Sequence, residues 1–176
     1  MKNQKTTKQT MNRAFITAQL TTMARDNFKP AALLQPLLNI IARAYDINKP
    51  AWEAGAVKIL DWLKAPIKDA IVTPFSMFTF KNAKLPFLSW STLPGFNCPG
   101  ALECWLAAKG FCYSLKAWRN APPLFRQLQN TLIERSPAYR GLIHEELKKL
   151  LNTRKFRGQN VPFRLYVDGD FASVQG

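Results

Sequence analysis

The spacing of apolar and polar positions predicts a mostly helical chain. Apolar residues recur every three or four positions across residues 12–24, 30–41 and 50–71, which predicts helices there. Pro30 suits the first turn of the second of these helices. "PPLFRQLQNTLIERS" and "PAYRGLIHEELKKLLN" are amphipathic in the same way. The apolar stripes expected for these two helices are Leu124, Leu128 and Leu132 in the first, and Leu142, Ile143, Leu147 and Leu150 in the second.

Two stretches have the character of strands. In "TPFSMFTFKNAKLPFLSWSTLPG", aromatic and β-branched residues alternate with polar ones, which predicts one or two short strands. "VPFRLYVDGDF" predicts another strand that ends at Asp168, with a turn at Gly169. We therefore expect an α+β fold, mostly helical with a small sheet. The alternative is a shortened α/β barrel-like fold, because the second strand needs partners and few strands precede it.

The chain is long enough for one domain with a real core. We expect a disordered basic tail over 1–11 and a single domain over 12–176, in which 12–73 is helical and 74–176 is a cysteine-containing α/β part. No apolar run reaches the roughly 18 to 20 residues of a membrane span, so no transmembrane segment is expected. We also expect no signal peptide, and the three cysteines favour a cytoplasmic setting.

The charge balance adds a functional hypothesis. The chain has 25 Lys and Arg against 11 Asp and Glu, for a net charge of +14. Such an excess attracts polyanions, so nucleic acid is the first partner to consider, followed by an acidic protein or an anionic membrane surface. The alternative is that the charge only keeps the protein soluble.

The run "KKLLNTRKFRGQ" is the best candidate for nucleic-acid contact. It supplies cations for phosphates and one aromatic ring, Phe156, for stacking on a base. The candidate residues are Lys148, Lys149, Arg154, Lys155, Phe156 and Arg157. No named DNA-binding motif is present, so contact would follow the backbone. The alternative is a solvated helix end, where Lys and Arg are also favourable.

Three cysteines with the spacing C-x5-C-x7-C form the second candidate site. Cys98, Cys104 and Cys112 are close enough in sequence to ligate a metal, because thiolates are preferred by zinc and iron–sulfur clusters. His144, the only histidine, is a conceivable fourth ligand. The spacing matches no common zinc pattern, so small buried hydrophobic residues are the alternative.

"LPGFNCPGALECWLAAKGFCYSLKAWRN" followed by "FRLYVDGDF" resembles the phage and plasmid family named for mycobacteriophage gene product eighty-eight. The family pattern is L-P-x-x-T-C-P-G-A-x-x-C, then C-Y-A, then a strand ending in G-D-F. The resemblance covers roughly residues 85–171. This chain departs from the pattern at Asn97, Ser114, Tyr166 and Asp168, and it lacks the longer downstream region of the family.

The resemblance implies a mobile-element accessory protein with a cysteine-centred zinc or iron–sulfur site. The metal or cluster site is implied through a second phage family, thought to be related to radical S-adenosylmethionine proteins, to which the cysteine block and the acidic "GDF" strand end are similar. The resemblance also implies that Asp168 and Asp170 bind a cofactor, although "DGD" is more often a plain turn. The sequence-based hypothesis is thus a metal or iron–sulfur site combined with a basic nucleic-acid surface. The alternatives are a non-enzymatic interaction protein with structural cysteines and a truncated remnant of a radical-S-adenosylmethionine-like enzyme.

Overall fold

The computed structural model describes residues 34–35, 38–39, 49–64, 73–80, 87–94, 98, 113–134 and 136–165. The elements in this part of the chain are α3 (Lys49–Lys64), β1 (Leu88–Ser89), the 3-10 helix η1 (Tyr113–Arg119), α5 (Ala121–Glu134), α6 (Tyr139–Leu151) and β2 (Phe163–Arg164). The described residues are mostly helical and include a small parallel sheet, which confirms the α+β prediction.

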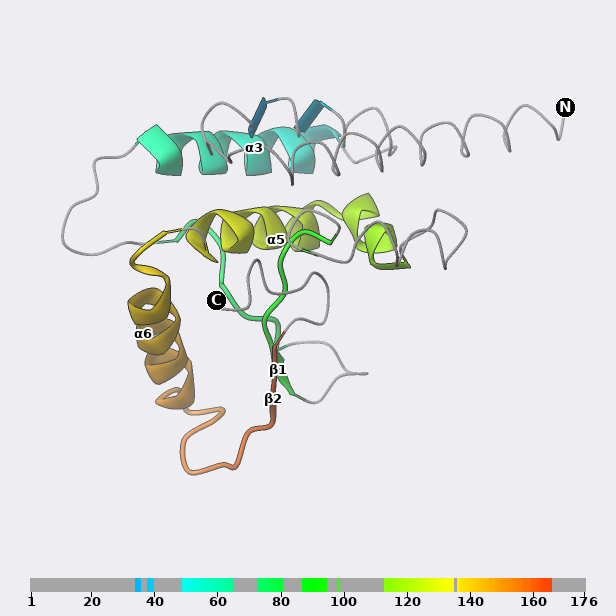
Figure 1. Cartoon of the computed structure of the whole chain (residues 1–176). Helices are drawn as coiled ribbons and strands as arrows, with labels where there is room; N and C mark the ends of the chain where they lie inside the picture. The colour runs from blue at the N-terminus through cyan, green and yellow to red at the C-terminus, as the bar shows by residue number, and fades with distance from the viewer. Residues whose placement is uncertain are drawn as a thin grey trace, which may run out of the picture.

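Helix α5 lies at the centre of the described fold, with α3 alongside it (Figure 1). The three leucines of its predicted stripe are buried, and they pack with α3 through Ile59 and with Trp118 of η1. Leu34 and Leu38 join the same cluster from helical positions, as expected for the segment 30–41. Apart from residues 34–35 and 38–39, the predicted helical positions before residue 49 lie outside the described residues, as do positions 65–71 of the predicted helix 50–71.

A second apolar cluster lies between α5, α6 and the sheet. It is formed by Met77, Phe78, Leu88, Trp90, Ile133 and Phe156. The predicted stripe of α6 is half-buried and packs against this cluster. Helix α6 lies at a steep angle to α5 (Figure 1), so it covers the second cluster and not the first.

The sheet joins segments far apart in the sequence. β1 and β2 are parallel, with Leu88 opposite Phe163 and Ser89 opposite Arg164. On its other side, Ser89 forms an antiparallel bridge with Thr79. β1 therefore lies between the segment around Thr79 and β2. Each of the two predicted strand regions contains one of these short strands, and residues after Leu165 lie outside the described part.

Polar side chains of α5 hold the loop segments that precede and follow the sheet. The Gln129 amide pairs with the backbone of Phe75, accepting from its N–H at 2.9 Å and donating to its carbonyl at 3.0 Å. The Asn130 Nδ2 donates to the carbonyls of Met77 and Ser91, both at 2.9 Å. Because these amides are buried, they replace the water that the loop backbone would otherwise need.

Within the described residues, none of the helices combines the length and the apolar character that a bilayer crossing requires.

Two helical glycines are expected to respond in opposite ways to alanine. A Cβ atom at Gly55 would lie far inside van der Waals distance of the buried Phe125 ring, whereas one at Gly141 would meet no atom within 4 Å. We expect Gly55→Ala to lower the free energy of unfolding by about 1–2 kcal/mol, since overpacking outweighs the gain in helix propensity. Gly141→Ala should raise it by about 0.5–1 kcal/mol. Urea denaturation followed by circular dichroism measures both, and shifts of the same sign would contradict the packing of α3 on α5.

Candidate nucleic-acid interface

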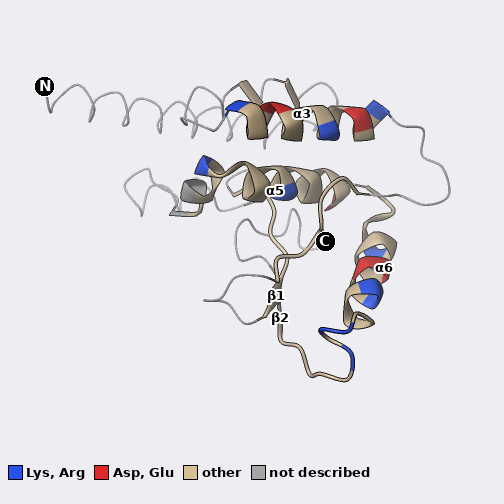
Figure 2. Ribbon diagram, turned by 180° about the vertical axis from the view of Figure 1, so that it is seen from behind, with Lys and Arg blue, Asp and Glu red and all other residues tan. Residues whose placement is uncertain are grey.

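The end of α6 and the turn after it form an exposed basic segment, residues 148–157. Its five cations, Lys148, Lys149, Arg154, Lys155 and Arg157, are all exposed. Figure 2 shows them in blue along the lower part of α6 and the loop beyond it. The sequence has no Asp or Glu between Glu146 and Asp168. Within the described part of the chain, no carboxylate lies within 4.0 Å of any of the five cations, so none of them forms an ion pair there.

The backbone of the basic segment is folded back on the end of α6. Thr153 organises the turn: its N–H and hydroxyl donate to the Leu150 carbonyl, and its own carbonyl accepts from the N–H groups of Phe156 and Arg157. Gly158 ends the turn with φ +73°, a left-handed conformation that favours glycine. These bonds fix the backbone from which the cations project, which lowers the entropy cost of binding a partner.

Phe156 anchors the basic segment to the protein interior. Its side chain is 8% exposed and belongs to the apolar cluster beneath α6. Its ring meets Phe80 edge-on, with the centroids 5.8 Å apart. A buried ring has no open face for a base, so the stacking role expected for Phe156 does not fit its position. Phe156 therefore contributes to the packing of the basic segment on the second apolar cluster, and not to base stacking.

Lys155 combines its charge with a structural role. Its ammonium lies 5.4 Å from the Phe80 centroid and 5.1 Å from the Phe156 centroid, close enough for cation–π attraction to both rings. It also donates to the Phe80 carbonyl at 3.3 Å. Arg157 similarly donates from Nη2 to the Asn152 carbonyl at 3.0 Å. Arg154 makes no side-chain hydrogen bond to another described residue, so its guanidinium, unlike that of Arg157, is fully available to a ligand.

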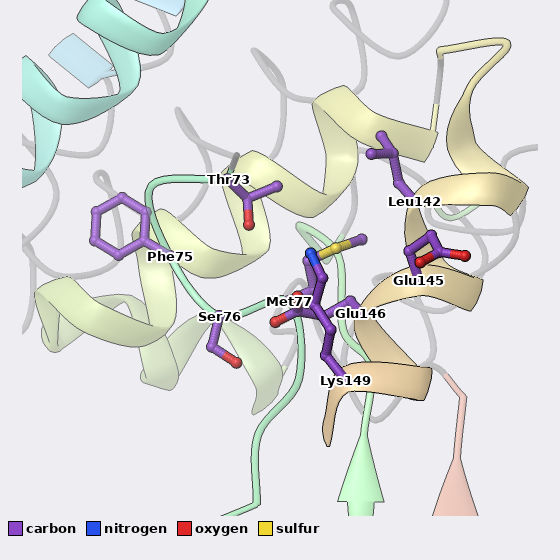
Figure 3. Close-up of a pocket in the computed structure, with 8 residues that line it drawn as sticks. All are labelled: Thr73, Phe75, Ser76, Met77, Leu142, Glu145, Glu146 and Lys149. Carbon is purple, nitrogen blue, oxygen red and sulfur yellow. The ribbon is translucent and has the colours of Figure 1, made fainter. Parts of the chain in front are cut away.

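Lys149 also borders a pocket between α6 and the segment at 73–77. Figure 3 shows its side chain extending from α6 toward Met77. The pocket is lined by Thr73, Phe75, Ser76, Met77, Leu142, Glu145, Glu146 and Lys149. Lysines in the last turn of α6 are favourable there even without a ligand, because the helix C-terminus carries partial negative charge. The alternative explanation, that the cations are present only because they stabilise a helix C-terminus, therefore applies to Lys148 and Lys149 but not to the cations after Asn152.

Arg126 is a further cation that the sequence did not single out for this region. It lies on α5, where its Nε donates to the Ser76 carbonyl at 3.0 Å and its Nη1 to the Thr79 hydroxyl at 2.9 Å. Partial burial lowers the pKa of its guanidinium from the usual value. Among the described residues it has no carboxylate within 4.0 Å. No local sequence signal could have identified it, because the contacts join positions about 50 residues apart.

The structure describes Cys98 but not Cys104 or Cys112. Cys98 is half-buried and packs against the cluster between α3 and α5. The His144 side chain is 75% exposed, and its Nδ1 lies 3.6 Å from Glu145 Oε1. Within the described residues, no three His, Cys, Asp or Glu side chains gather as a metal-binding group. Because two of the three cysteines lie outside this part, the zinc or iron–sulfur site stays a prediction.

Asp168 and Asp170, the predicted cofactor-binding residues, also lie outside the described part of the chain. Comparison of the whole chain with protein-family models, curated proteins and solved structures gave no match. The resemblance to the phage and plasmid family, and the mobile-element role that it implies, therefore stay predictions. The basic segment is the candidate site whose geometry is described most fully.

Proposed function

We propose that this protein binds nucleic acid through the basic segment, by contacts to the phosphate backbone. The observation that carries the proposal is the exposure of five cations in ten residues, with no carboxylate within 4.0 Å of any of them in the described region. Unpaired surface cations release counterions from a phosphate backbone when it binds, and that release supplies most of sequence-independent affinity.

The anchored shape of the segment adds to this proposal. Phe156 and Lys155 fix the turn against Phe80, and the Thr153 hydrogen bonds fix its backbone. A flexible basic tail would lose conformational entropy on binding, whereas this turn has already lost most of it. The contacts would position the chain on phosphates without reading base identity, since no element of the described fold is a known groove-reading motif.

Neutralising the two arginines of the turn tests the proposal. We expect Arg154→Gln combined with Arg157→Gln to weaken binding to a labelled oligonucleotide on the order of tenfold at 50 mM salt, because two phosphate contacts are lost. Fluorescence anisotropy measures the change.

Arg140→Gln is the matched control, since Arg140 is equally exposed but lies in the first turn of α6. The control removes one charge and the double variant removes two, so a loss of about threefold in the control, the same per charge, would show that only net charge matters. Wild-type protein that binds an acidic peptide but neither single-stranded nor double-stranded DNA or RNA would favour an acidic protein partner instead.

A further inference from the structure

The segment Phe75–Phe80 collects basic side chains from four different parts of the fold. Lys58 comes from α3, Arg126 from α5, Lys149 from α6 and Lys155 from the basic segment. Helices that are distant in sequence thus place positive charge along one short stretch of backbone. Six residues span at most about 20 Å when fully extended, so the cations lie along a narrow path.

At the beginning of this stretch, the Lys58 ammonium lies 5.8 Å from the centroid of the Phe75 ring. Arg126 is bound to the next part of the path, through the Ser76 carbonyl and the Thr79 hydroxyl. The ring of Phe75 is itself half-buried and stacks on Phe125 of α5, so this end of the path is held firmly.

Two more cations follow toward the basic segment. Lys149 lines the same pocket as Phe75 and Ser76, on the side formed by α6 (Figure 3). Lys155 binds the Phe80 carbonyl and lies over the Phe80 ring. Because Lys149 and Lys155 also belong to the basic segment, the path continues the proposed phosphate-binding surface toward α3.

Arg126 has the properties of a fixed phosphate contact. Two neutral acceptors, the Ser76 carbonyl and the Thr79 hydroxyl, hold its Nε and Nη1 and so orient the plane of the guanidinium. Its Nη2 donates to no partner in the described structure, and no carboxylate there neutralises its charge. Arginine's rigid fork suits phosphate, and an orientation fixed in advance reduces the entropy lost on binding.

We propose that single-stranded nucleic acid follows the segment Phe75–Phe80, with one phosphate at Arg126 and others at Lys58 and Lys149. The proposal rests on the nucleic-acid function proposed above. Arg126 is half-buried between α5 and the segment, so a thin, flexible strand reaches it more readily than a duplex, which is wide and stiff over this length.

Two carboxylates limit this path on the α6 side. Glu145 and Glu146 line the pocket that Lys149 also borders, and either would repel a nearby phosphate. The strand is therefore expected to lie on the α5 side of the pocket, at Arg126, and to meet Lys149 only at the end of its side chain, which extends from α6 toward Met77 (Figure 3).

Lys58 provides the sharpest test, because it lies outside the basic segment and α3 offers a matched control. Lys58 and Lys64 are both exposed lysines of α3, but only Lys58 lies over Phe75 in the described structure. The probes are a labelled thymidine 20-mer and the corresponding duplex, measured with the full chain by anisotropy over a series of salt concentrations. We expect Lys58→Gln to weaken single-strand binding about threefold and to reduce the salt slope by about 0.7, the value for one phosphate contact. Lys64→Gln should leave both unchanged.

Equal effects of Lys58→Gln and Lys64→Gln would overturn the inference, as would a duplex bound as tightly as the single strand. If the turn double variant Arg154→Gln, Arg157→Gln weakens binding while Lys58→Gln does not, the proposed function stands and this path is wrong. If the wild-type protein binds neither probe at 50 mM salt, both are wrong.

Discussion

Replacing Asn130 by leucine is expected to lower the free energy of unfolding by about 2–4 kcal/mol. The Asn130 side chain is fully buried, and its Nδ2 bonds the carbonyls of both Met77 and Ser91. Leucine is similar in size but leaves two interior carbonyls without a donor, and each unpaired group costs about 1–3 kcal/mol. The buried Asn130 Oδ1 accepts no hydrogen bond from another described residue, so removing this oxygen offsets part of the loss.

Urea denaturation followed by circular dichroism measures this effect. Asn160→Leu is the matched control, since Asn160 is exposed in the loop before β2. The control should change the free energy of unfolding by less than about 0.5 kcal/mol. Equal effects of the two substitutions would mean that α5 does not hold the segments around Met77 and Ser91.

Phe156→Ala is expected to have the second largest effect, and on two properties at once. Loss of a buried ring should lower the free energy of unfolding by about 2–4 kcal/mol. Nucleic-acid binding should also weaken, about threefold or more, although no charge is removed, because the turn loses its anchor and must be ordered on binding. Urea denaturation and anisotropy at fixed salt measure the two.

Phe156→Leu separates anchoring from base stacking. Leucine still fills most of the buried site, so it should retain most of the stability and nearly all of the affinity. A stacking residue would behave in the opposite way: both substitutions would abolish its contribution to affinity, and neither would change stability. That second pattern would contradict the buried position of Phe156.

Much of the helical framework could be predicted from periodicity. The stripe Leu124, Leu128 and Leu132 is buried, and the proline-led stretches begin helices within one or two residues of the expected positions. The reason is physical: an apolar stripe at helical spacing lies on one face of a helix, and it leaves water only when that face packs on the core. In α5, the residues that the sequence pattern predicts to face the core are the residues that the fold buries.

The polar side of α5 could not be predicted in the same way. Gln129 and Asn130 have the pattern of a solvent-facing helix surface, yet both are fully buried. Their partners are backbone groups of Phe75, Met77 and Ser91, about 40 to 54 residues away in sequence. A sequence shows which side chains can donate a hydrogen bond, but not which distant loop will need one.

The charge of the candidate site could be predicted from the sequence, but the arrangement of its side chains could not. A run of Lys and Arg without a carboxylate is visible in the sequence, and all five cations are exposed as expected. The geometry depends on the position of residues 75–80 in the fold. These residues contribute to the burial of Phe156, supply the Phe80 ring beneath Lys155 and bind the guanidinium of Arg126. That position is set by long-range packing, which no local pattern encodes.

The salt dependence of single-strand binding tests the nucleic-acid function most directly. Five phosphate contacts by the basic segment alone predict a slope of log affinity against log salt of about −3.5 for a single strand, and the two further contacts proposed at Arg126 and Lys58 would steepen it to about −4.9. In the double variant Arg154→Gln, Arg157→Gln, the slope should be shallower by about 1.4, the value for two contacts. A slope near zero for the wild-type protein, or the same slope for both proteins, would show that the basic segment does not bind the phosphate backbone.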